Sequence, residues 1–108
     1  MIRCEFFTED ERITGFTVSG HSGYEERGKD VICAYVSAVV TMAEATINDM
    51  CGAKAKVRVK DEQARISLTL PVSCDEEESV QAVLTGMMLT LAGLRDDYPD
   101  YIEVVMEV

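Results

Sequence analysis

The chain has 108 residues, a hydrophobic fraction of 47% and a formal net charge of −10. This length predicts a single domain over residues 1–108 that can form a core without disulfides. The acidic excess argues against direct binding of nucleic acid, because phosphate contacts need a basic surface.

The first part of the chain is predicted to form a hairpin. Residues 2–8 and 13–19 alternate partly between apolar and polar side chains around a polar link, which is typical of paired antiparallel strands. In the second run, Thr14, Phe16 and Val18 share one face. Because a strand-like pattern rather than a signal peptide begins the chain, we expect a cytoplasmic location, where thiols stay reduced.

A loop and a long helix are predicted next. Gly20, Gly23 and Gly28 punctuate the loop, which runs to Asp30, a candidate helix N-cap. The helix is expected over residues 31–51, with Gly52 as its C-terminal cap. Its apolar run, around residues 31–43, is too short and mixed for a membrane span, so no membrane contact is expected.

Two rows of apolar residues follow the predicted helix. The first row contains Val31, Tyr35, Ala38, Met42 and Ala45. The second row contains Ile32, Val36, Val39, Ala43, Ile47 and Met50. We therefore expect burial on more than one side, against a sheet and against a second subunit.

The second half of the chain repeats the strand–strand–helix order and adds a strand. Residues 54–60 and 64–70 alternate strictly, and residues 73–76 match a capping box that opens a helix. The apolar stripe of this helix is Val80, Leu84, Met87, Leu91 and Leu94, and residues 101–108 form the last strand. The fold class is therefore α+β: strand-strand-helix-strand-strand-helix-strand, with two helices packed on a mostly antiparallel sheet.

His21 and Cys33 are the candidates for nucleophilic chemistry. His21 is the sole histidine, and it lies in the glycine-bearing loop, from which an imidazole can take the proton of a thiol. Cys33 is predicted in the first helical turn, where unpaired N–H groups favour a thiolate. On these residues alone, a cysteine in the core is the commoner interpretation. The four cysteines form no Cys-x-x-Cys pair and there is a single histidine, so no metal site is expected, and no cofactor is expected either.

Three short motifs add a resemblance to a known family: Gly20-His21-Ser22-Gly23, Gly28-Lys29-Asp30-Val31-Ile32-Cys33-Ala34 and Ser37-Ala38. Together they resemble the signature of the ribosomal-processing cysteine protease Prp family. The resemblance implies a bacterial endopeptidase that removes a short N-terminal extension from a large-subunit ribosomal protein and so supports ribosome assembly.

The resemblance also implies roles for single residues and an oligomeric state. It assigns His21 as the general base, Cys33 as the nucleophile, and Asp30 and Ser37 as supporting residues. The glycine-bearing loop would be flexible and would order over the bound peptide. The family resemblance further implies a homodimer.

Two other functions stay open on the residues alone. A non-catalytic ribosome-assembly module would bind the same peptide without cutting it, and Cys33→Ala would leave that function intact. A thiol redox sensor would join Cys33 to a resolving cysteine, and it predicts a disulfide under mild oxidant.

Overall fold

The computed structural model describes residues 1–20 and 27–108, including all their side chains except those of residues 27–30 and 63. In these ranges the elements are β1 (Ile2–Glu9), β2 (Arg12–Gly20), α1 (Arg27–Glu44), β3 (Lys56–Lys60), β4 (Arg65–Thr69), α2 (Glu77–Asp97) and β5 (Ile102–Glu107). The strands form one sheet in the order β3-β4-β2-β1-β5. The β1–β5 pair is parallel and the other pairs are antiparallel. The predicted element order and the mostly antiparallel sheet are therefore confirmed.

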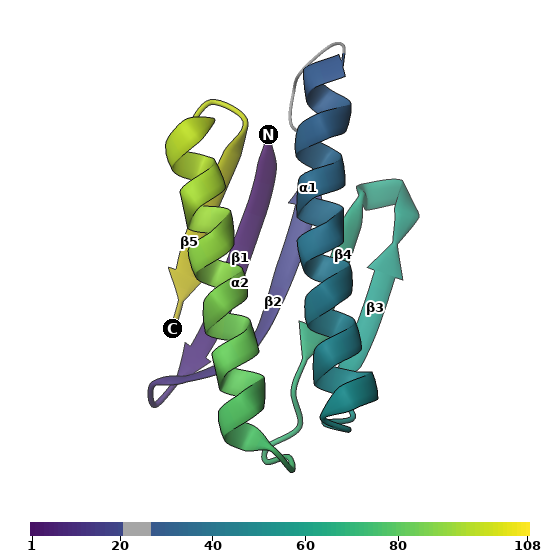
Figure 1. Cartoon of the computed structure of the whole chain (residues 1–108), viewed down its shortest axis with the longest axis vertical. Coiled ribbons are helices and arrows are strands. Elements are labelled where there is room, and N and C mark those ends of the chain that lie inside the picture. The colour runs from purple at the N-terminus through teal and green to yellow at the C-terminus, as the bar shows by residue number, and fades with distance from the viewer. Residues whose placement is uncertain (21–26) are drawn as a thin grey trace.

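Helices α1 and α2 lie side by side on one face of the sheet (Figure 1). Helix α2 covers the side of β5 and β1, whereas α1 covers the side of β4 and β3 (Figure 1). The predicted stripe of α2 is buried against the sheet and α1. The largest fully buried side chains come from both layers: Phe6, Phe16, Ile47, Leu68, Leu84, Met87 and Leu91. The core thus lies between the helical layer and the sheet.

A β-bulge changes the inner face of β2. Phe7 pairs with Gly15 and Thr8 pairs with Ile13, so Thr14 is the extra residue between them. The bulge places Ile13 and Phe16 in the core together, although strict alternation would separate them. The prediction that Thr14 shares the inner face with Phe16 is wrong for this reason.

Helix α1 continues into a π-helical turn, Ala45–Met50. Gly52 then adopts a φ of +65° and its N–H donates to the Asn48 carbonyl at 3.1 Å, which confirms the predicted C-terminal cap. The Asn48 side chain accepts from the Ala55 N–H at 2.8 Å and donates to the Ala55 carbonyl at 3.1 Å. These bonds hold the chain where it leaves the helix for β3.

One of the two apolar rows of the helix is buried or half-buried up to Ile47, with only its last residue, Met50, exposed, and the other row is open in the single chain. Ile32 and Val36 are 2% and 4% exposed, whereas Val31 and Met42 are 66% and 50% exposed. Burial by the sheet is confirmed, and burial on a second side is absent from the described part of one chain.

By length and composition alone, this helix passes the test for a membrane span. The stretch Val31–Met50 has a mean hydropathy of 1.5, so the expectation that the apolar run is too short is wrong. The reason is that the helix stays apolar beyond residue 43. Core helices pass the same test, and α1 packs on the sheet along one side, so this is weak evidence for a membrane.

Helix α2 begins without the predicted capping box. Its N-cap residue is Glu76, which has a φ of +57° and makes no capping hydrogen bond through its side chain. Instead Arg12 donates to both carboxylate oxygens of Glu77, at 2.8 and 3.1 Å, and to the Pro71 carbonyl at 2.9 Å. These bonds tie the β1–β2 hairpin to the start of α2, and the bond from Arg12 is the main cause that lowers the pKa of Glu77.

Replacing Glu77 by glutamine should reduce the free energy of unfolding by about 0.5–1 kcal/mol at pH 7, the range of partly exposed ion pairs. Because the folded pKa of Glu77 lies below its unfolded value, the stabilisation is present above about pH 4.3. It is lost as the pH falls through the folded pKa. Urea unfolding of both proteins at pH 7 and pH 3 measures this difference.

Glu78→Gln is the matched control, since no described side chain forms an ion pair with Glu78. The free energy of unfolding of this variant should differ from that of the wild type by a similar small amount at both pH values. An E77Q effect that stays constant between pH 7 and pH 3 would contradict the role of the ion pair.

Candidate functional site

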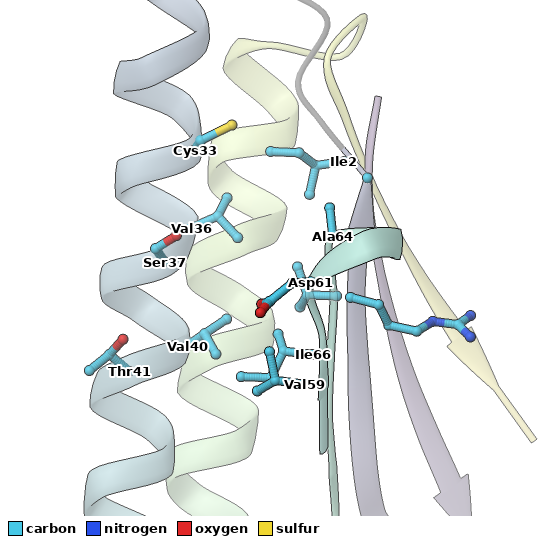
Figure 2. Close-up of a pocket in the computed structure, with 13 residues that line it drawn as sticks. Ile2, Cys33, Val36, Ser37, Val40, Thr41, Val59, Asp61, Ala64 and Ile66 are labelled. Atoms are coloured by element: carbon cyan, nitrogen blue, oxygen red, sulfur yellow. The ribbon is translucent and has the colours of Figure 1, made fainter. Parts of the chain in front are cut away.

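A cleft of about 380 Å³ lies between α1 and the adjoining ends of β1, β2 and the β3–β4 hairpin. Figure 2 shows α1 as one wall and the strands as the other. Its walls are mainly apolar, formed by Ile2, Val18, Val36, Val40, Val59 and Ile66. A thiol, two hydroxyls and a carboxylate also line it: Cys33, Ser37, Thr41 and Asp61. The cleft therefore combines an apolar surface with a small set of reactive or polar groups, as ligand sites do.

Cys33 and Ser37 lie on the wall formed by α1. The thiol of Cys33 is partly exposed and extends into the cleft toward the strand wall (Figure 2). Ser37 follows one helical turn later on the same side of α1 and lines the same cleft. The structure thus brings together two of the four polar residues proposed for the site from the sequence.

The start of α1 corrects the expected position of Cys33 in the helix. The helix begins at Arg27, so Asp30 lies within the first turn and is not the N-cap residue. Cys33 consequently lies in the second turn, not the first. Since the effect of the helix dipole falls off beyond the first turn, it stabilises a Cys33 thiolate less than expected. The side chain of Asp30 is outside the described part of the chain.

Gly20 brings the end of β2 to the cleft. Its φ is +88°, and a Cβ added there would lie 2.4 Å from the Met1 carbonyl oxygen. Its N–H donates to the Ala64 carbonyl at 3.1 Å. Gly20 therefore lies against the residue that precedes β1 on one side and the residue that precedes β4 on the other. His21 follows Gly20 directly in the sequence.

The loop predicted over residues 20–30 is wrong at both ends. Gly20 belongs to β2 and Gly28 belongs to α1, because the strand pairing and the helix extend further than the glycines indicate. His21 and Gly23 lie outside the described residues, so their predicted roles stay predictions.

The other three thiols lie away from the cleft. Cys4 is fully buried, and burial, followed by the charge of Glu103, raises its pKa to about 12, so it stays protonated near neutral pH. The pKa of Cys74 is also raised, first by burial and then by its bond to Glu77. The structure describes all four cysteines, and none of them forms a disulfide. Within the described ranges, no group of three His, Cys, Asp or Glu side chains is placed to hold a metal ion.

Sequence reasoning missed the strand wall of the cleft. Asp61 falls in the short link between the strands predicted at residues 54–60 and 64–70, yet it lines the cleft opposite α1 (Figure 2). Ala64 and Ile66 lie beside it because β4 pairs with β2, whose end carries Gly20. No local pattern in the sequence signals this pairing, since the two strands are separated by all of α1 and β3.

Known structures share the fold of this chain. Two crystal structures of the ribosomal processing protease Prp from S. aureus each have a TM-score of 0.86 and cover 99% of this chain and 100% of their own. One holds a covalently linked product peptide and is 22% identical in sequence, and the other holds a substrate peptide and is 20% identical. At these identities the likeness shows the shared fold.

Sequence comparison gives the family. The ribosomal processing cysteine protease Prp of Bacillus subtilis (strain 168) is 27% identical over 103 residues, which cover 94% of this chain and 92% of that protein. The family model for cysteine protease Prp matches residues 1–103. Because that match spans almost the whole sequence, and the free thiol of Cys33 lines a cleft of this fold, the chain belongs to the cysteine protease Prp family.

Proposed function

We propose that this chain is a ribosomal processing protease that removes a short N-terminal extension from a bacterial large-subunit ribosomal protein. The observation that carries the proposal is the Cys33 thiol in an apolar cleft of a Prp family fold. The B. subtilis relative, which is a ribosomal processing protease, supports the class of substrate. The S. aureus structures with peptides support a peptide as the ligand. Such a function would place the protein in the cytoplasm.

The proposed reaction is acyl transfer through a thioester. His21 takes the proton of the Cys33 thiol, and the thiolate attacks the scissile carbonyl carbon. The C–N bond then breaks, and the imidazolium gives its proton to the leaving amine. Water hydrolyses the thioester, which releases the carboxylate product and restores the thiol. Ser37 is proposed to assist by hydrogen bonding, since its hydroxyl lines the cleft one turn from Cys33, and Asp30 is proposed to support His21.

The test is incubation of the protein with a peptide that spans the N-terminal extension of the ribosomal protein of the same organism. Mass spectrometry should find one cut at a defined bond. A His21→Ala variant should not cleave this bond, which would test the proposed role of His21 as the general base. If the folded protein binds the peptide by fluorescence anisotropy and leaves it whole, a non-catalytic binding module replaces the protease as the function.

We also propose that the protein is a homodimer in which the open row of α1 packs against a second copy. Tyr35 and Met42 belong to this row, and their side chains are 42% and 50% exposed in the single chain. Burying such a row in a two-fold interface would remove apolar surface from water on both chains.

Met42→Glu should therefore weaken the dimer by at least about tenfold in Kd, since it would bury a charge in an apolar contact. Sedimentation equilibrium of the wild type and the variant measures this. Val72→Glu is the matched control, because Val72 is 97% exposed and lies outside α1. A wild type that sediments as a monomer at every concentration, or a V72E variant that dissociates equally, would contradict the proposed interface.

A further inference from the structure

We infer that Asp61 selects a cationic side chain, lysine or arginine, in the peptide bound by the cleft. The inference deepens the proposed function and rests on it, because it concerns which peptide the same cleft accepts. It adds a specificity-determining residue on the strand wall, opposite the α1 wall that holds Cys33.

The position of Asp61 is fixed by its turn. It begins the 3-10 turn Asp61–Gln63 that joins β3 to β4, and its backbone carbonyl accepts the Ala64 N–H at 3.1 Å. Ala64 closes this turn with a φ of +46°. Figure 2 shows the Asp61 carboxylate directed across the cleft toward α1, from which Val36 and Val40 line the same cleft. The turn thus fixes the backbone from which this exposed carboxylate enters the cleft.

No described side chain neutralises the Asp61 carboxylate through an ion pair. Arg65 is the other charged residue of the lining, but its exposed position in β4 alternates with Ile66 and Leu68, which face the helices. Its side chain therefore belongs to the open face of the sheet. Among the described side chains, none forms an ion pair or hydrogen bond with the Asp61 carboxylate. The charge is available to a ligand.

A lysine or arginine side chain fits both features of this wall. Its aliphatic stem can pack along Val40 and Val59, while its charged end reaches the Asp61 carboxylate. A peptide carboxylate at the same place would face a like charge beside an apolar surface, which is unfavourable. The 61% exposure of Val59 shows that this apolar surface is open to such a stem.

The test uses quenched fluorescent peptides that span the N-terminal extension of the ribosomal protein of the same organism. Lysine, norleucine and glutamate are placed one at a time at each position of these peptides. For the wild type, kcat/KM should favour lysine over norleucine by about fivefold at one position, the upper range for a partly exposed ion pair. That ratio should fall toward 1 in Asp61→Asn, and in the wild type it should shrink in 0.5 M NaCl because salt screens the pair.

Glu62→Gln is the matched control. Glu62 is the next residue of the same turn and is exposed, but it does not line the cleft, so this variant should keep the wild-type ratio. A lysine preference that persists in Asp61→Asn, or that Glu62→Gln removes equally, overturns the inference. So does a wild type with no lysine preference at any position.

A binding measurement separates this inference from the proposed function. Fluorescence anisotropy of the same peptides with Cys33→Ala, and with the double variants that add Asp61→Asn or Glu62→Gln, gives the lysine-to-norleucine ratio of Kd values without any cleavage. If no peptide is cut but the ratio depends on Asp61, the proposed protease function fails and the charge selection stands. If peptides are cut and the ratio does not depend on Asp61, only the charge selection fails.

Discussion

Cys33→Ala is expected to lower kcat/KM for peptide cleavage by about 10⁴-fold or more, because the variant has no group that can form the thioester. The loss should appear in kcat, since the side chain removed is small and the apolar walls of the cleft, where the peptide is proposed to bind, remain. Rates of product formation, followed by chromatography over several peptide concentrations, give kcat and KM separately. Anisotropy should show that the variant still binds the peptide.

Cys74→Ala is the matched control for this experiment. Cys74 is also a free and partly buried thiol, but it lies before α2 and does not line the cleft. The C74A variant should therefore keep the wild-type cleavage rate. Circular dichroism and thermal unfolding of both variants verify that they fold. Cleavage that survives in Cys33→Ala would overturn the role of Cys33 as the nucleophile. A loss of cleavage in a folded C74A variant equal to that in Cys33→Ala would show that the assay does not report on the cleft.

The order of the elements was predictable because it depends on local periodicity. The stripe of α2, with Leu84 and Leu91 fully buried, follows the helical period, and the strands follow the alternation of apolar residues. The bulge at Thr14 was not predictable, because it depends on how β2 pairs with β1. The capping box failed for a similar reason: Arg12, distant in the sequence, holds Glu77 at the start of α2.

The candidate site was predictable only where it follows one helix. Cys33 and Ser37 are four residues apart, so helical geometry places them on one face, and the structure places both in the cleft. The start of α1 was misplaced because Gly28 is a poor helix former, whereas the chain is helical there despite this propensity. Asp61 was missed because sheet pairing, not local sequence, carries the β3–β4 turn to the opposite wall.

Gly20→Ala is expected to lower the free energy of unfolding by about 1–3 kcal/mol, the range for a residue with a side chain held at an unfavourable φ. The φ of +88° disfavours alanine, and the new Cβ would lie 2.4 Å from the Met1 carbonyl oxygen. Met1 cannot shift freely, because Ile2 pairs with Gly20 in the sheet and its N–H donates to the Tyr101 carbonyl at 2.9 Å. Each kcal/mol should lower Tm by about 4–8 °C in a domain of this size.

The same change should reduce cleavage at temperatures well below the Tm of the variant. Relief of the clash must displace the end of β2, and Gly20 both lines the cleft and directly precedes His21 in the chain. Gly86→Ala is the matched control, because a Cβ there meets nothing within 4 Å and alanine favours the helix by about 1 kcal/mol. The Gly86→Ala variant should have a higher Tm than the wild type and the same cleavage rate. If the Gly20→Ala variant has the Tm and the cleavage rate of the wild type, the end of β2 does not need its left-handed backbone. If its Tm is lower but its cleavage rate is that of the wild type, the substitution affects stability alone and the cleft tolerates the displacement of β2.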